Sequence, residues 1–137
     1  MIRQFSISVS IVAGLLIAPI ICANAATVTN VADHPILASG AKLTEDAIRK
    51  NIILAGLKRH WHMADDGPGQ LKAVQESANQ SATVSITYTT TSYSIKLLDS
   101  TGLDQKGDDI DRRYNGWIRY LTQDIDDQLS EAGLGVQ

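Results

Sequence analysis

The chain has 137 residues, with 12 Lys and Arg against 15 Asp and Glu, and a formal net charge of −3. This length suits one domain but not two. The slightly acidic balance gives no electrostatic attraction for nucleic acid, so we expect no nucleic-acid partner.

Residues 1–25 have the pattern of an export signal. Arg3 supplies a positive start, residues 11–21 form a short apolar run, and residues 23–25 (ANA) are a cleavage motif, with the cut expected after Ala25. The apolar run is shorter than the roughly 20 residues that span a bilayer, so we expect no transmembrane segment in the mature protein. The sequence therefore predicts a periplasmic or secreted protein.

Cys22, the only cysteine of the chain, suggests a second way in which the signal could be processed. A cysteine at the end of an apolar signal can become a lipid-modified N-terminus. Lipoprotein processing favours a small residue before the cysteine, where this chain has Ile21. Cleavage after Ala25 would instead leave a mature chain without cysteine, and so without disulfides or thiolate metal sites. Lipid anchoring through Cys22 is the alternative to a soluble exported protein.

The segment that follows lacks a sustained period. Residues 26–42 contain Pro35 and Gly40 and are predicted to be flexible, with one short strand near residues 28–31. Residues 43–59 are then predicted to form the first helix, because Thr44 is a good N-cap and apolar residues recur at helical spacing.

Short alternating runs predict four strands, at residues 61–64, 70–75, 82–88 and 93–98. Alternation of apolar and polar residues is typical of an antiparallel sheet with one buried face and one face in solvent. Residues 99–109 are rich in Gly and Asp and are predicted to be a loop.

The last helix is predicted at residues 110–131, with Asp108 or Asp109 as its cap. Gly116 interrupts it, and we interpret this glycine as a place where another element approaches closely. Full burial of Trp117 would make Trp117→Ala one of the most damaging core substitutions. The apolar stripe of this helix recurs at spacings of three and four and comprises Ile110, Tyr114, Trp117, Ile118, Leu121, Ile125 and Leu129.

This order of elements predicts an α+β fold. We expect a two-layer sandwich, with an antiparallel sheet of about four strands and two helices on one face, in the order α-β-β-β-β-α. The single domain is expected over residues 43–133, after the signal (1–25) and the flexible segment (26–42).

Two candidate metal sites are incomplete. His60 and His62 would share one face of a strand and could bind a divalent metal, but no third histidine stands at a matching spacing. The loop at residues 99–109 fails the calcium-loop template, because Asp104 and Ile110 stand where that template has glycine and glutamate. We therefore expect no metal and no cofactor.

The remaining polar and aromatic residues suggest a binding site without catalytic residues. We select Tyr93, Asp99, Ser100 and Asn115 as its members. Asn115 lies off the apolar stripe of the last helix, and its amide would bond the turn at Asp99 and Ser100 and tie that helix to the sheet. The sequence has no G-x-S-x-G motif and no phosphate-binding glycine loop.

Several short motifs follow one another along the chain. They are Ala55-Gly56 followed by Trp61, then Pro68-Gly69, A-x-V-x-I-x-Y at residues 82–88, Y-S-I and D-S at residues 93–95 and 99–100, and Y-N-x-W-I at residues 114–118. In this order the chain resembles a family of small, uncharacterised exported proteins and lipoproteins of Gram-negative bacteria. The resemblance implies a place in the cell envelope and no established activity. Family members often carry histidines where this chain has Asp111 and Gln80-Ser81, so no catalytic histidine is carried over.

Three functions remain open at this point. The first is a non-enzymatic periplasmic domain that binds a partner or ligand in the cell envelope. The alternative is a small metal-dependent or hydrolytic periplasmic enzyme that uses His60 and His62 or the loop at residues 99–109. The third is an envelope-assembly accessory that pairs an exposed edge strand, such as residues 70–75, with a partner.

Overall fold

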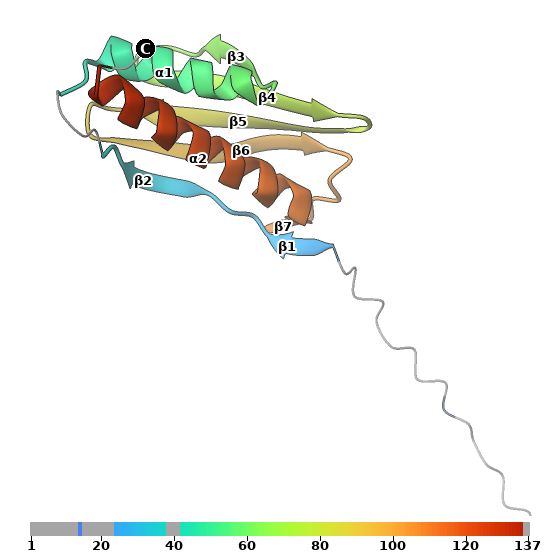
Figure 1. Cartoon of the computed structure of the whole chain (residues 1–137). Helices are drawn as coiled ribbons and strands as arrows, with labels where there is room; N and C mark the ends of the chain where they lie inside the picture. Colours follow the sequence, from blue (N-terminus) through green and yellow to red (C-terminus); the bar gives the residue numbers. More distant parts are fainter. Residues whose placement is uncertain (1–13, 15–23, 38–41, 136–137) are drawn as a thin grey trace, which may run out of the picture.

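The computed structural model describes residues 14, 24–37 and 42–135 (Figure 1). Most of the predicted signal, including Cys22, lies outside these residues. The expected cleavage after Ala25 falls within the first strand, after its first residue. The described elements are, in chain order, β1 (Ala25–Thr27), β2 (Val31–Pro35), α1 (Glu45–Lys58), β3 (His62–Asp65), β4 (Gln70–Ser77), β5 (Gln80–Tyr88), β6 (Ser92–Thr101), β7 (Asp109–Asp111) and α2 (Arg112–Gly133).

The main sheet is antiparallel, five-stranded and ordered β2-β6-β5-β4-β3. Both helices lie on one face of it, and the short β1–β7 pair lies beside the beginning of α2 (Figure 1). The predicted α+β two-layer sandwich is therefore confirmed. The sheet has one strand more than the expected four, because β2 pairs with β6. No helix formed by the described residues is long and apolar enough to cross a membrane.

The segment predicted to be flexible contributes two strands. β1 pairs with β7, and β2 pairs with β6 through Val31 opposite Ile95 and His34 opposite Tyr93. Residues 28–30, where a strand was expected, connect the two. β2 lies at an edge of the sheet, which is where a strand tolerates a residue such as Pro35 that cannot donate a backbone hydrogen bond. Its partner strand, distant in sequence, stabilises it.

The predicted edge strand at residues 70–75 is interior. It belongs to β4, which pairs with β3 on one side and β5 on the other. The edges of the main sheet are β2 and β3. Pairing of a partner with an exposed edge at residues 70–75 is therefore excluded.

The long predicted loop is shorter than expected. β6 continues to Thr101, and β7 begins at Asp109. A β-bulge near the end of β6 interrupts the alternation of this strand, since Thr83 pairs with Asp99 while Val84 pairs with Leu97.

The caps define the helix boundaries. The backbone N–H of Ala47 donates to the Thr44 hydroxyl at 3.2 Å, so Thr44 is the predicted cap of α1. The cap of α2 is Asp111 rather than Asp108 or Asp109, because its carboxylate accepts from the backbone N–H of Arg113 at 2.9 Å.

Two expectations about α2 need correction. Trp117 is only partly buried and packs against the core, whereas Tyr114 is fully buried, so truncating Trp117 removes less buried area than expected. A Cβ at Gly116 would meet no atom within 4 Å, so no element approaches it closely. The close approaches lie elsewhere: a Cβ at Gly56 would collide with Met63, and one at Gly102 with the backbone of Asn79.

Gly102 and Gly107 provide a matched test of close backbone packing. Both have a positive φ, +69° and +59°, but a Cβ at Gly107 would meet nothing within 4 Å. We expect Gly107→Ala to lower the free energy of unfolding by about 1–2 kcal/mol through backbone strain. Gly102→Ala should cost roughly 1–3 kcal/mol more, because the new methyl group overpacks against Asn79. Urea denaturation of both variants measures the difference, and equal losses would contradict the close approach.

Candidate functional site

The four residues selected from the sequence lie in separate places. Tyr93 is buried in the core near the start of β6, where its hydroxyl donates to Asp126 Oδ1 at 2.8 Å. Asp99 and Ser100 lie near the other end of the same strand, and the Ser100 hydroxyl bonds the side chain of Gln105. The structure therefore does not bring these residues together as one site.

Asn115 makes a different bond from the one expected. Its Oδ1 accepts from the backbone N–H of Thr29 at 2.9 Å, and its Nδ2 donates to the carbonyl of Thr27 at 2.8 Å. The turn at Asp99 and Ser100 is not its partner. An amide side chain has both an acceptor oxygen and N–H donors, and the backbone at residues 27–29 offers the complementary N–H and carbonyl groups. Asn115 thus joins the N-terminal segment, rather than β6, to α2.

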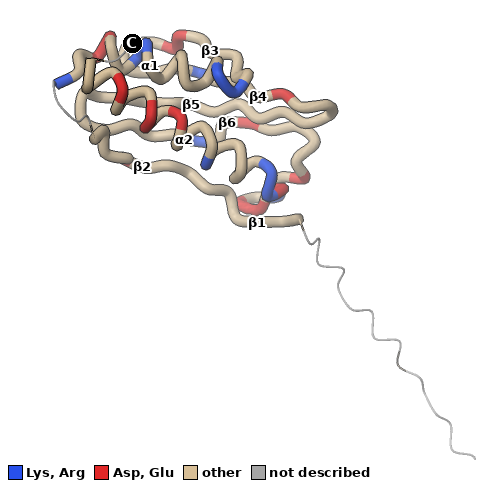
Figure 2. Tube along the Cα trace, viewed as in Figure 1, with Lys and Arg blue, Asp and Glu red and all other residues tan. Residues whose placement is uncertain are grey.

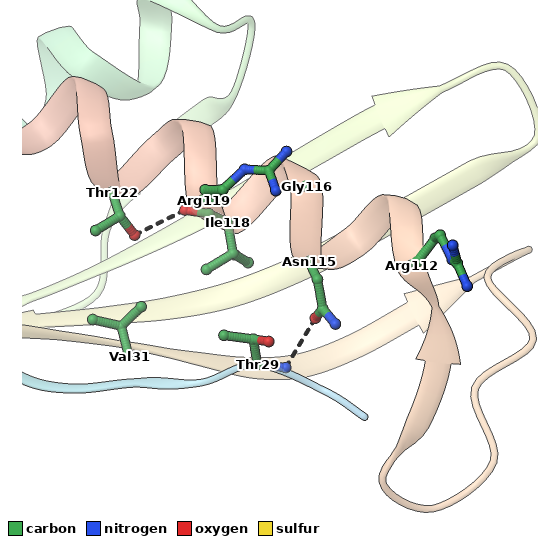
Figure 3. Close-up of a pocket in the computed structure, with 8 residues that line it drawn as sticks. All are labelled: Thr29, Val31, Arg112, Asn115, Gly116, Ile118, Arg119 and Thr122. Atoms are coloured by element: carbon green, nitrogen blue, oxygen red, sulfur yellow. Dashed lines mark hydrogen bonds between the residues drawn. The ribbon is translucent and has the colours of Figure 1, made fainter. Parts of the chain in front are cut away.

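Beside this bond lies a groove of about 580 Å³ between residues 29–31 and α2, which we call the α2 groove (Figure 3). The side chains of Val31 and Ile118 point toward one another across it. Gly116 leaves open space at the helix surface. The lining residues are Thr29, Val31, Arg112, Asn115, Gly116, Ile118, Arg119 and Thr122.

The charges of α2 oppose its helix dipole. The helix begins with Arg112 and Arg113 and has no acidic residue in its first turn and no basic residue in its last. Figure 2 shows basic residues on the first half of α2 and acidic residues on the second. Each misplaced charge costs roughly 0.3–1 kcal/mol at a helix end. The cap Asp111 offsets part of the positive charge at the start of α2.

The two histidines selected as metal candidates do not lie on the same strand. His60 has a positive φ of 64° between α1 and β3, and His62 is the exposed first residue of β3. They do not share a strand face as expected. No group of three His, Cys, Asp or Glu residues within the described part of the chain is arranged to hold a metal ion.

His34 makes a contact that sequence reasoning missed. Its Nε2 lies 2.9 Å from Asp126 Oδ2, and its ring lies 5.1 Å from the ring of Tyr93. Asp126 therefore joins β2, β6 and α2 through two different side chains. Burial raises the pKa of Tyr93 above its ordinary value, and the hydrogen bond to Asp126 and the charge of that carboxylate raise it further. Assigning His34 to a flexible segment concealed this cluster.

The fold and the groove define a two-layer α+β domain with an apolar, arginine-flanked cleft beside its last helix. Comparison of the chain with protein families, curated proteins and solved structures found no match. The resemblance to small exported proteins stays a prediction.

Asn115→Ala tests the link between the N-terminal segment and α2. Loss of two hydrogen bonds should lower the free energy of unfolding by about 1–3 kcal/mol. It should also speed amide hydrogen exchange at Thr29, whose N–H loses its acceptor. Thr122→Val is the control, because Thr122 lines the same groove but its hydroxyl donates to the carbonyl of Ile118 in its own helix. Unchanged exchange at Thr29 in Asn115→Ala would contradict the assigned contact.

The buried tyrosines predict a loss of stability at alkaline pH. Burial raises the pKa of both Tyr93 and Tyr114 above 10.0, so the folded state holds their protons more tightly than the unfolded state does. Their contribution is complete below that pH and is lost as pH rises toward the folded pKa. We expect the free energy of unfolding to fall above pH 10.0, less steeply in Tyr93→Phe. Ionisation of both tyrosines in the folded protein at their ordinary pKa, followed by ultraviolet absorbance, would contradict this.

Proposed function

We propose that the protein is a non-enzymatic exported domain that binds a partner in the cell envelope through the α2 groove. The partner segment would be extended and would carry an acidic side chain. The observation behind this proposal is the groove itself, with an apolar floor at Val31 and Ile118 and arginines at positions 112 and 119. The export pattern of residues 1–25 and the resemblance to exported proteins support the location.

The shape of the groove favours an extended segment. One wall is the N-terminal segment around Thr29, whose backbone runs beside α2, and the other is the side of the helix that carries Asn115 and Ile118 (Figure 3). The space opposite Gly116 would accept an aliphatic side chain, because a Cβ there has no neighbour within 4 Å. Apolar pockets with a few placed polar groups are the usual form of small binding sites.

The charge of the groove favours an acidic partner. The guanidinium of Arg119 lies 5.1 Å from the centre of the Tyr120 ring and points away from Thr29 and Val31 (Figure 3), so it lies at the outer rim of the groove. An arginine presents several N–H donors in a planar fork that matches a carboxylate. Retaining arginines near the start of a helix, where the dipole disfavours them, is consistent with recognition of an anion.

The test uses a panel of extended hexapeptides that differ only in a central Asp, Asn or Lys between valines. The protein is recovered from the periplasmic fraction of cells that express the full chain. We expect the Asp peptide to bind about ten-fold more tightly than the Lys peptide, a difference of about 1.4 kcal/mol. Gly116→Leu should abolish binding by filling the groove, and Arg119→Gln should remove the preference for Asp.

Lys96→Gln on β6 is the control for charge, because this exposed residue lies outside the groove. Calorimetry measures each affinity. Equal affinity for the Asp and Lys peptides, or binding that Gly116→Leu leaves intact, would contradict the groove as the site. Recovery of the protein only from the cytoplasm would contradict export.

A further inference from the structure

Both tryptophans of the chain line one small cavity. Its volume is about 140 Å³, and we call it the tryptophan pocket. It lies on a different part of α2 from the groove, since no residue lines both. The pocket is lined by Arg59, Trp61, Gln75, Trp117 and Tyr120.

Three parts of the fold bring these side chains together. Trp61 follows α1, and its backbone N–H donates to the carbonyl of Gly56 at 2.9 Å, which fixes the chain as it leaves the helix. Gln75 comes from β4, and Trp117 and Tyr120 come from α2. Trp61 is almost fully buried, whereas Trp117 is partly buried and Tyr120 is 44% exposed. Because the guanidinium groups of Arg59 and Arg119 lie over the ring of Tyr120, the aromatic surface open to a ligand is that of Trp117.

The charged side chain among the lining residues, that of Arg59, is paired with a carboxylate. Arg59 Nε donates to Asp124 Oδ2 at 2.5 Å, and its guanidinium lies 4.9 Å from the centre of the Tyr120 ring. The carboxylate balances the charge, and the guanidinium already occupies the face of Tyr120 where a ligand cation would bind. Within the described residues, Arg59 Nη1 has no hydrogen-bond acceptor, so it has donors to offer.

Gln75 supplies a hydrogen-bond acceptor, which complements the donors of Arg59. Its Oε1 atom is buried and has no hydrogen-bond partner among the described residues. A buried acceptor that is left unsatisfied destabilises the folded state. Because the atom is buried, a ligand hydroxyl in the pocket would satisfy it once the terminal amide rotates toward the pocket. The lining thus combines flat aromatic surface, one acceptor and one set of donors.

We propose that the tryptophan pocket binds one pyranose ring of a neutral saccharide. The apolar C–H face of a sugar ring stacks on the electron-rich face of an indole, and its hydroxyls both donate and accept hydrogen bonds. Such a ring would place a hydroxyl on Gln75 Oε1 and an acceptor on Arg59. A purely aromatic ligand would leave both polar groups unused. The volume is well below the roughly 300–1,000 Å³ of pockets for drug-sized ligands, which restricts the site to a single ring.

Intrinsic fluorescence tests this proposal directly, because every tryptophan of the chain lies at the pocket. The protein is titrated with methyl glucoside, with N-acetylglucosamine, with glucuronate and with cyclohexanol. We expect a saturable change in emission with the neutral sugars at millimolar concentration. Cyclohexanol has an apolar ring with one hydroxyl and should give at least ten-fold weaker binding. No saturable change with either neutral sugar, or an equal response to cyclohexanol or glucuronate, would overturn the proposal.

Variants separate binding from folding. Gln75→Leu removes an unsatisfied buried acceptor, so it should keep or raise the thermal midpoint while it weakens sugar binding at least ten-fold. Arg59→Lys should also weaken binding, whereas Arg49→Lys should not. Arg49 is the matched control, because it too pairs with a carboxylate, that of Asp65, but lies outside the pocket. Unchanged sugar affinity in folded Gln75→Leu would overturn the proposal, and Gly116→Leu should leave sugar binding intact.

Discussion

The ion pair between Arg59 and Asp124 fixes how the two helices meet. Asp124 is almost fully buried in the middle of α2, and Arg59 stands at the C-terminal cap of α1. A buried carboxylate requires a partner, and removing one member of such a pair leaves an uncompensated charge. Only one rotation of α2 about its axis brings Asp124 to Arg59. That rotation also places Tyr120 against the Arg59 guanidinium. It directs Ile118 and Leu121 into the core and leaves Asn115 facing the N-terminal segment.

In this orientation, the two flanks of the buried stripe of α2 line two different sites. With about 3.6 residues per turn, the stripe that includes Tyr114, Ile118 and Leu121 faces the sheet. Asn115 and Arg119 lie on one flank of that stripe, beside the α2 groove, and Tyr120 lies on the other, beside the tryptophan pocket. A single helix therefore lines both the α2 groove and the tryptophan pocket. Substitutions on one flank need not disturb the site on the other flank.

The sequence predicted what local periodicity controls and missed what distant partners control. The two helices and strands β3 to β6 follow from spacings of 3.6 and 2 that are visible within each segment. β2 has no such pattern, and its order comes from Tyr93 and Ile95 on a strand far along the chain. Asn115 stood out because it lies off the apolar stripe, but its partners at residues 27–29 depend on β1, which the sequence did not reveal. Helical spacing assigned Trp117 to the core and could not show that it lines a pocket together with Trp61.

Two features that lower the stability of this fold lie next to the α2 groove and the tryptophan pocket. The basic start of α2 opposes the helix dipole beside the groove, and the unsatisfied Gln75 amide lies at the tryptophan pocket. A sequence selected only for stability would place acidic residues at the start of α2 and an apolar residue at position 75. Natural chains depart from local rules mainly where a function requires it. The buried Tyr114 hydroxyl, which also lacks a partner, lines neither hollow, and nothing in the structure explains it. The conflict at Gln75 differs from that one because Gln75 lines a pocket, so a hydroxyl that entered the pocket would resolve it.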